Sequence, residues 1–465
     1  MRKLALLILL FFSFHGSFAQ SPGLDTLRFQ DFLEWVRAFH PVSRQADITL
    51  EMGQMEVRTA RGGFDPLLFG NLDQKTYKST DYYDRREAGV TIPTMAGIEL
   101  MGTYEQNSGQ FLDPENSVPS GGLFAAGAAV NVGQGLILDE RRAALRQAKI
   151  YQQSTEAERQ VLLNELYLKG AETYWKWSES FFNMKAFEEA VRLTKIRYEA
   201  VKRSFEQGDV AAIDTVEAYT QLLSRQYRLQ GLQNQYFVQT QMLSSFLWNE
   251  EEEPMMLNSY VFPQSLDPED DFMINNEELR VLVGNHPQLQ MADFELASLD
   301  VERRLKSQSL LPVVKLKYNF LVESLDGFEQ APFFENNYKF GVSFYTPILW
   351  RKARGSVGLA KAKIDFKQNS RDLKELELRN KLEAEIDTWS TYNLQVQTVR
   401  ENVNNLERLL YAEMRKFEMG ESSLFLVNAR EVSVFDARIT LNGLAAKRKI
   451  SFAKVRYASG IGFEQ

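Results

Sequence analysis

The chain has 465 residues, no cysteine, three histidines and a formal net charge of −8 at pH 7. The lack of cysteine excludes disulfides, thiolate metal sites and a lipid anchor on cysteine, and the acidic balance argues against a nucleic-acid partner. Beyond the N-terminal segment only His40 and His286 remain for acid–base or metal chemistry. We therefore expect no enzyme, no cofactor and no metal site.

The N-terminus has the three regions of a secretory signal. Arg2 and Lys3 are basic, residues 4–14 form an apolar run, and small residues precede Gln20. This order predicts a signal peptide over residues 1–19 with cleavage between Ala19 and Gln20. No later segment reaches about 18 uninterrupted apolar residues, so we expect no transmembrane helix.

The next elements indicate that the chain is built twice. Each half begins a helical stretch with a His-Pro pair, at His40 and at His286, where proline suits the first helical turn and the preceding residue lies outside the helix. Further identities occur at the same offset, Ala46 with Ala292, Asp47 with Asp293, Leu50 with Leu296 and Pro66 with Pro312. We predict repeats at residues 20–249 and 276–465, joined by an acidic linker at residues 250–275.

Alternating segments follow the first helix of each half. Apolar residues recur at every second position over residues 313–322 and 338–344, and in the first half over residues 124–132, with a less regular stretch at residues 88–104. This period predicts strands with one apolar face. Such a sheet packs on a soluble core or faces lipid in a β-barrel. Four strands cannot close a barrel, so in lipid several chains must share one.

Two very long helices complete the halves. Residues 136–205 and 351–417 contain no proline, and a helix of that length runs roughly 105 Å. In the second, apolar residues step by three and four, as in a coiled coil. Each stretch ends near a glycine, Gly208 or Gly420, and a further helical pattern follows. Helical hairpins alone suit rods or signalling coils, but hairpins preceded by lipid-compatible strands indicate a tube.

The order of these elements and the tip segments resemble the TolC-like outer-membrane efflux proteins (outer membrane factors). The most specific pieces are residues 198–218, with Phe205-Glu206-Gln207-Gly208, and residues 417–429, with Phe417-Glu418-Met419-Gly420. The resemblance implies a mainly α fold in which long helical hairpins form a periplasmic α-barrel. Four strands per chain would contribute to a shared, trimeric 12-stranded transmembrane β-barrel.

The resemblance also implies what such a protein does and where. It would be a homotrimeric channel in the outer membrane, contacting its lipid, with a periplasmic extension. It would accept substrates from a periplasmic adaptor (membrane fusion protein) and an inner-membrane transporter, in efflux or type I secretion. An alternative from the residues alone is a periplasmic coiled-coil scaffold or adaptor without a membrane barrel.

Members of this family carry acids six and nine residues after the tip glycine, where copies form a charged ring that narrows the pore. Here these residues are Asp214 and Glu217 in the first half, but Leu426 and Ala429 in the second. The alternative role for the acids is helix capping. The family's tether residues also differ, because Phe417 replaces a tyrosine and Ser422 an arginine. From the resemblance we predict a pore gate at Asp214, Glu217 and Phe417.

The exposed turns between the long helices are the predicted contacts for the adaptor. They comprise Gly208, Asp209, Val210 and Ala211 in the first half and Gly420, Glu421, Ser422 and Ser423 in the second.

Overall fold

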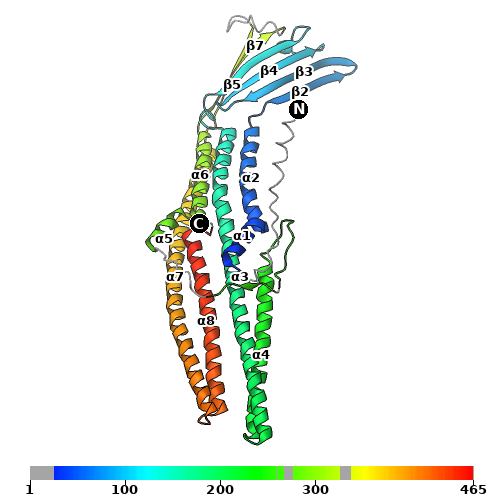
Figure 1. Ribbon diagram of the computed structural model, residues 1–465. Coiled ribbons are helices and arrows are strands. Elements are labelled where there is room, and N and C mark those ends of the chain that lie inside the picture. Colours follow the sequence, from blue (N-terminus) through cyan, green and yellow to red (C-terminus); the bar gives the residue numbers. More distant parts are fainter. Residues whose placement is uncertain (1–25, 259, 267–275, 325–336, 464–465) are drawn as a thin grey trace, which may run out of the picture.

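The structure is a computed structural model that describes residues 26–258, 260–266, 276–324 and 337–463. The predicted signal peptide and its cleavage site at Ala19 and Gln20 lie outside the described residues. The molecule is long, with a twisted sheet at one end and the tips of two helical hairpins at the other (Figure 1). The predicted fold class, mainly α with a β part, is confirmed.

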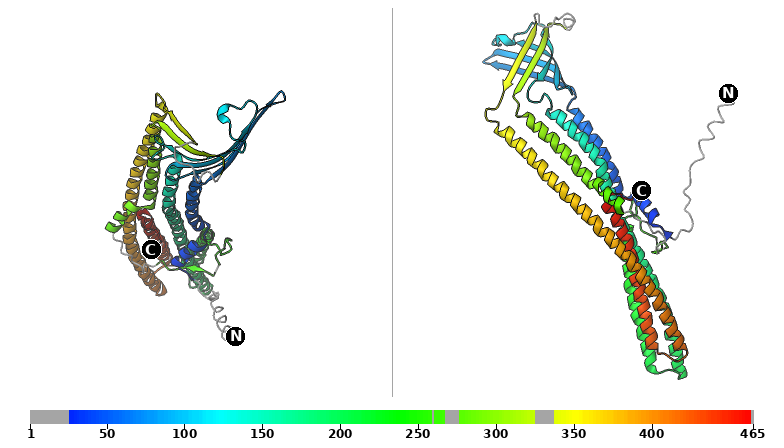
Figure 2. Two further views of the ribbon diagram at one scale, coloured as in Figure 1. Left: turned by 90° about the horizontal axis from the view of Figure 1, so that it is seen from above. Right: turned by 90° about the vertical axis from the view of Figure 1, so that its left-hand side faces the viewer.

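The hairpins are the longest elements. The first consists of α3 (Glu140–Gln207) and α4 (Ala212–Ser244), and the second of α7 (Arg351–Glu418) and α8 (Leu424–Ser459). The helices α3 and α7 each contain 68 residues, as their proline-free sequences predict, and so run about 100 Å. The two hairpins lie side by side toward the tips (Figure 2).

Shorter helices connect the hairpins to the rest of the fold. Both His-Pro pairs start helices of 22 residues, because His40 Nδ1 accepts from the backbone of Val42 (3.1 Å) and His286 Nδ1 from that of Gln288 (3.2 Å). The predicted role of the histidines as helix starts is therefore confirmed. These and the remaining short elements are α1 (Phe29–Phe39), α2 (Pro41–Gly62), α5 (Asn276–Leu282), α6 (Pro287–Gln308) and the 3-10 turns η1 (Pro114–Asn116) and η2 (Val283–Asn285).

The larger sheet has six strands among the described residues, where four were expected. All neighbours are antiparallel, in the order β2-β3-β4-β5-β7-β8. The strands are β2 (Leu67–Tyr77), β3 (Thr80–Pro93), β4 (Ile98–Ser108), β5 (Leu123–Asn131), β7 (Val313–Val322) and β8 (Tyr338–Tyr345). The expected count is wrong because β2 has only a weak alternation, with Phe69 on the polar face and Gln74 on the apolar face, and because Arg86 on the apolar face interrupts the pattern of β3.

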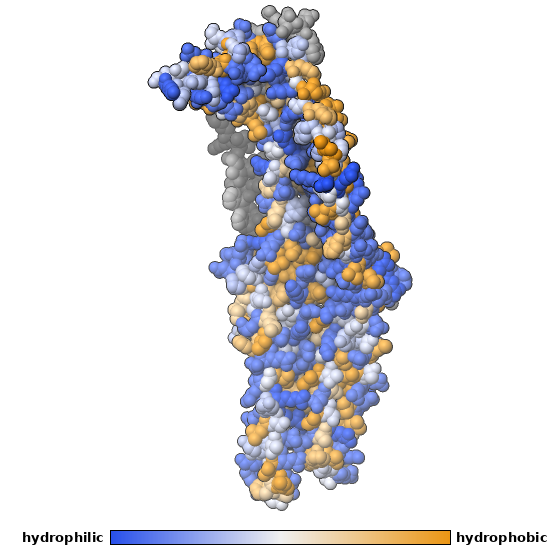
Figure 3. All heavy atoms as spheres, turned by 180° about the vertical axis from the view of Figure 1, so that it is seen from behind, coloured by the Kyte–Doolittle hydropathy of each residue, from blue (hydrophilic) through white to orange (hydrophobic). Residues whose placement is uncertain are grey.

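One face of this sheet is mostly apolar, although the outer part of β3 carries the ion pair of Asp84 and Arg86 on that face. A single row of paired residues on that face consists of Leu68, Val90, Gly102, Ala126, Phe320 and Tyr338. The opposite face is polar. There Asn71 donates to Glu87 (3.2 Å) and Lys315 pairs with Glu99 (3.4 Å). On the face drawn in Figure 3, apolar side chains gather at one side of the sheet end and again at the tips.

The two halves of the chain meet along the ladder between β5 and β7. Gly127 lies in this ladder, and a Cβ atom there would overlap the carbonyl oxygen of Tyr318. A side chain at position 127 would therefore force the two strands apart. Among the described helices, none combines the length and apolar character that crossing a membrane requires.

The largest apolar core lies midway along the shaft, where α1 packs on the first hairpin. Phe32, Tyr174 and Trp177 are fully buried there, and the Tyr174 hydroxyl donates to the carbonyl of Leu27 (2.6 Å). In the predicted acidic linker, the described residues contain β6 (Phe262–Pro263), which pairs in parallel with β1 (Thr26–Leu27). Residues 259 and 267–275 of that linker lie outside the described part.

Candidate functional site

Both helical tips end in the same backbone arrangement. At the first tip Gly208 donates to Phe205 O and Asp209 to Ser204 O, both at 2.9 Å. At the second, Gly420 donates to Phe417 O (3.0 Å) and Glu421 to Lys416 O (2.9 Å). Each is a Schellman motif, which needs a residue in the left-handed region. The φ angles of Gly208 and Gly420 are +84° and +76°, so glycine is required at both tips.

Most of the predicted adaptor contacts lie in solvent. Six of these eight residues are exposed, namely Gly208, Asp209, Ala211, Gly420, Glu421 and Ser423, whereas Val210 and Ser422 are half-buried. Val210 packs with Leu424, Val201 and Ala218. This small cluster joins α3, α4 and α8, so Val210 connects the tips of the two hairpins within one chain.

The aromatic side chains of the second tip do not take part in that cluster. Phe417 is 36% exposed and Phe425 66% exposed. Leu424, by contrast, is buried. The predicted contribution of Phe417 to a gate therefore depends on contacts outside a single chain.

The two predicted gate acids have different partners. Asp214 accepts from the backbone N–H of Ala211 (3.2 Å) at the start of its own helix α4, which is the capping alternative. Glu217 accepts from the side-chain amide of Asn428 on α8 (3.3 Å). Glu217 thus reaches the other hairpin and takes part in a tether that the family pattern assigns to other residues.

Above this contact lies a buried ion cluster that joins three helices. Glu431 on α8 receives Arg197 of α3 through both oxygens, at 2.8 and 3.0 Å, and Arg225 of α4 at 2.6 Å. Arg197 also donates to Asn428 (3.3 Å). The Arg225 guanidinium stacks over the ring of Phe435, 5.3 Å from its centre. We call Arg197, Arg225, Asn428 and Glu431 the tip cluster.

The charged side chains of the tip cluster are largely shielded from solvent. Glu431 is 3% exposed and Arg225 is 5% exposed. Burial lowers the pKa of Arg225, and the charge of Glu431 opposes that shift. Two guanidinium groups share one carboxylate, and the Nε atom of Arg225 has no hydrogen-bond partner among the described residues. Because an unpaired buried charge is costly, the cluster depends on Glu431.

Sequence reasoning missed the tip cluster, although the sequence holds one signal for it. The apolar seam of α8 includes Leu424, Val427 and Val434, so position 431 falls on the buried side. A glutamate on an apolar seam requires a partner, because an isolated buried carboxylate is expensive. The partners themselves come from the other half of the chain.

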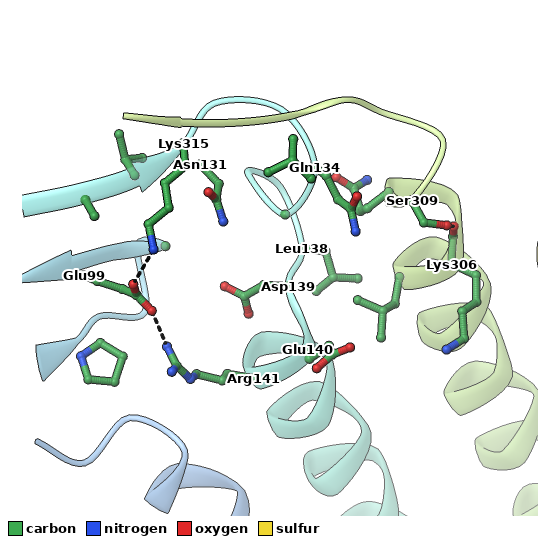
Figure 4. Close-up of a pocket in the computed structure, with 18 of the residues that line it drawn as sticks. Glu99, Asn131, Gln134, Leu138, Asp139, Glu140, Arg141, Lys306, Ser309 and Lys315 are labelled. Carbon is green, nitrogen blue, oxygen red and sulfur yellow. Dashed lines mark hydrogen bonds and ion pairs between the residues drawn. The ribbon is translucent and has the colours of Figure 1, made fainter. Parts of the chain in front are cut away.

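A second polar region lies where the sheet joins the helices (Figure 4). A hollow of about 740 Å³ opens there between β4, β5, β7 and the ends of α3, α6 and α7. Glu99 lies between Arg141 at the start of α3 (3.1 Å) and Lys315 on β7 (3.4 Å). These ion pairs align the polar face of the sheet with the helices beneath it.

The histidines are set up as neutral helix caps. Burial lowers the pKa of His286 to about 4 and also lowers that of His40. No group of three or more His, Cys, Asp or Glu residues in the described part of the chain could hold a metal ion.

Residues 279–460 match the family model described as outer membrane efflux protein. No curated protein matches the chain. Solved structures with the same fold include the CmeC outer membrane channel of Campylobacter jejuni, at 15% identity and a TM-score of 0.66, covering 94% of this chain and 86% of that one. The outer membrane protein VceC of Vibrio cholerae is 14% identical, with a TM-score of 0.66, and the match covers 94% of this chain and 97% of that one. The open state of the Neisseria gonorrhoeae MtrE outer membrane channel is 13% identical, with a TM-score of 0.65, and the match covers 93% of this chain and 89% of that one.

The family match and the solved structures test the predicted family of the chain and its predicted location in the cell. The structural likeness extends the channel fold over almost the whole chain, and the family match covers most of the second half. The predicted location in the cell outer membrane, with a periplasmic extension, is confirmed by the same family match. The predicted resemblance is thus confirmed, because residues 279–460 match the outer membrane efflux protein family and almost the whole chain has the fold of the solved outer membrane channels.

Proposed function

We propose that three copies of this chain assemble into a passive duct. The sheets join into one β-barrel in the outer membrane, and the helical hairpins continue as a tube across the periplasm. Substrates enter at the helical tips and leave at the sheet end. The energy for export comes from an inner-membrane transporter.

One observation carries this proposal, namely the sheet of a single chain. Its apolar face is uncovered, with Leu68 88% exposed and Phe344 65% exposed. Its outermost strands, β2 and β8, each pair on one side only. Lipid suits the apolar face, but free backbone groups at an open edge are not tolerated in lipid. Further copies of the chain remove those edges.

The tips are the proposed docking site for a periplasmic adaptor. Gly208, Asp209, Gly420 and Glu421 are exposed, and the two Schellman motifs hold their backbones in one shape. A partner can therefore recognise the turns without ordering them. Single cysteines at Asp209 and Glu421 allow cross-linking without background, since the chain has none. Capture of a periplasmic adaptor is expected, and its absence in cells that express a cognate adaptor contradicts this assignment.

The tip cluster is the proposed latch of the duct. It holds α8 of the second hairpin against both helices of the first, close to the entrance. Opening the entrance by separating the hairpins breaks the contacts of Glu431 and exposes Arg225 to water. Asp214 and Glu217 provide negative charge beside the same entrance and favour cations there.

The proposal is tested by fractionation and mass. The purified protein in detergent is expected at three times the mass of the mature chain, and cell fractionation is expected to recover it with the outer membrane. A soluble periplasmic monomer or dimer would support the coiled-coil scaffold instead. Single channels in planar bilayers then report whether the trimer conducts ions.

A further inference from the structure

We propose that all six strands of each chain enter the barrel wall, so that three chains close an eighteen-stranded barrel with β8 of one copy paired to β2 of the next. The inference rests on the proposed trimeric duct and specifies how its membrane part is built. It assigns β3 and β4 as wall strands added between those that the helices carry.

The connections between strands and helices identify the added pair. The helices α2, α3, α6 and α7 contact one another in that order, and they continue into β2, β5, β7 and β8. Between β2 and β5 lie β3 and β4, which are joined to each other by a short turn from Pro93 to Ile98. These two strands therefore have no helix beneath them.

The added strands have the two faces of a membrane wall. Val90 and Ile92 on β3 and Leu100 on β4 continue the apolar face, and farther out on β3 the two charges on this face, Asp84 and Arg86, form an ion pair with each other. On the other face, Asn71 donates to Glu87, and Asp73 forms an ion pair with Arg85. If β3 and β4 left the wall together, their apolar residues would enter water, and the ladders from β2 to β3 and from β4 to β5 would be broken.

The perimeter of the helical tube is compatible with the larger barrel. Four helices from each of three chains, spaced about 8–10 Å apart, enclose a ring roughly 100–120 Å round. Eighteen strands about 4.8 Å apart and tilted by about 40° enclose roughly 110 Å, whereas twelve enclose roughly 75 Å. The two added strands per chain thus match the barrel to the ring of helices.

The free edges are compatible with each other. Every residue of β8 is exposed, and so is every residue of β2 except Phe69. Because β2 leaves the helical end of the sheet and β8 returns to it, the two strands run antiparallel, like every other pair in the sheet. When their helical ends are aligned, Lys339 on β8 lies opposite Asp73 on β2, both on the polar face.

Paired cysteines test this closure, because the natural chain contributes no cysteine. Cysteines on the polar face of β8 are combined, one pair at a time, with cysteines on β2, oxidised in the membrane and analysed on non-reducing gels. Three positions are used on each strand, so that at least one pair of cysteines lies side by side even if β8 is shifted along β2 by two residues in either direction. The β8 positions are Lys339, Gly341 and Ser343, and the β2 positions are Phe69, Asn71 and Asp73.

Most of the protein is expected to shift to a covalent trimer for at least one pair between β8 and β2. One control combines the same β8 cysteines with Met101→Cys or Thr103→Cys on β4, which become neighbours only in a twelve-stranded barrel that excludes β2 and β3. A twelve-stranded barrel of β2, β5, β7 and β8 would also join β8 to β2, so a second control combines Phe69→Cys on β2 with Ala129→Cys on β5. These two positions become neighbours only if β3 and β4 leave the wall, and a disulfide between them also overturns the inference. Cross-links to β4, or none to either strand in a protein of trimeric mass, overturn the inference. A protein that is not trimeric in detergent refutes the proposed duct itself.

Discussion

The replacement Glu431→Gln tests the latch directly. The variant keeps the shape of the side chain but removes the only carboxylate that Arg197 and Arg225 contact in the tip cluster. Removing one partner of a buried ion pair costs about 3–5 kcal/mol when the other charge stays buried. Separation of the hairpins hydrates the arginines and relieves that cost.

The closed arrangement should therefore lose about 3 kcal/mol per chain relative to the open one, which is about a 100-fold shift in the equilibrium. Planar-bilayer recordings of the trimer are expected to show higher mean conductance and longer openings. The control is Asp436→Asn, which removes the neighbouring ion pair with Arg228 (2.8 Å), whose side chains are both 49% exposed. Exposed pairs contribute little, so this variant should conduct like the natural protein.

One result would refute the proposed role of the tip cluster as a latch. If Glu431→Gln forms trimers with conductance and open time equal to those of Asp436→Asn, the cluster does not restrain the entrance. A thermal melt of both variants separates this outcome from general loss of structure, because a gating effect requires that the trimer still melts cooperatively.

Three further predictions follow from the same structure. Because burial lowers the pKa of His286 to about 4 and the unfolded value is about 6.5, the unfolded chain binds the proton first on acidification. Stability is thus lost as the pH falls from about 6.5 to 4, by at most about 3 kcal/mol. His286→Asn, which keeps a capping acceptor, should flatten the melting temperature over that range, and an unchanged slope contradicts the burial argument. Gly208→Ala should lower stability by about 1–2 kcal/mol because of its left-handed φ, whereas the mid-helix control Gly231→Ala should raise it by about 0.5–1 kcal/mol; equal melting temperatures would contradict both signs. Combining Asp214→Asn, which can still cap α4, with Glu217→Gln should reduce the preference for cations, measured as reversal potential in a salt gradient, and an unchanged potential removes these acids from the pore.

The sequence predicted the helices well because their signals are local. Proline-free seams and the His-Pro starts depend on neighbouring residues, so α3, observed over Glu140–Gln207, was expected within a few residues at each end. The glycines at the tips were also identified correctly, since a left-handed turn after a helix is a local requirement.

The strand count and the partners of the gate acids depend on distant residues. The strand β2 was missed because Phe69 lies on its polar face and Gly70 and Gln74 on its apolar face, so the alternation becomes visible only once the rest of the sheet defines the two faces. Glu217 meets Asn428 across 211 positions of sequence. Glu431 alone gave a local signal, as a carboxylate on an apolar seam, but its arginines lie on the other hairpin.

The ladder between β5 and β7 has a consequence for how the protein is made. Its paired residues lie roughly 190 positions apart in the chain. A chain exported from its N-terminus therefore presents β5 as an open apolar edge until the second half has followed. Such edges invite aggregation. The ladder between β5 and β7 can therefore close only after the second half of the chain has followed, and the sheet is expected to form late in folding.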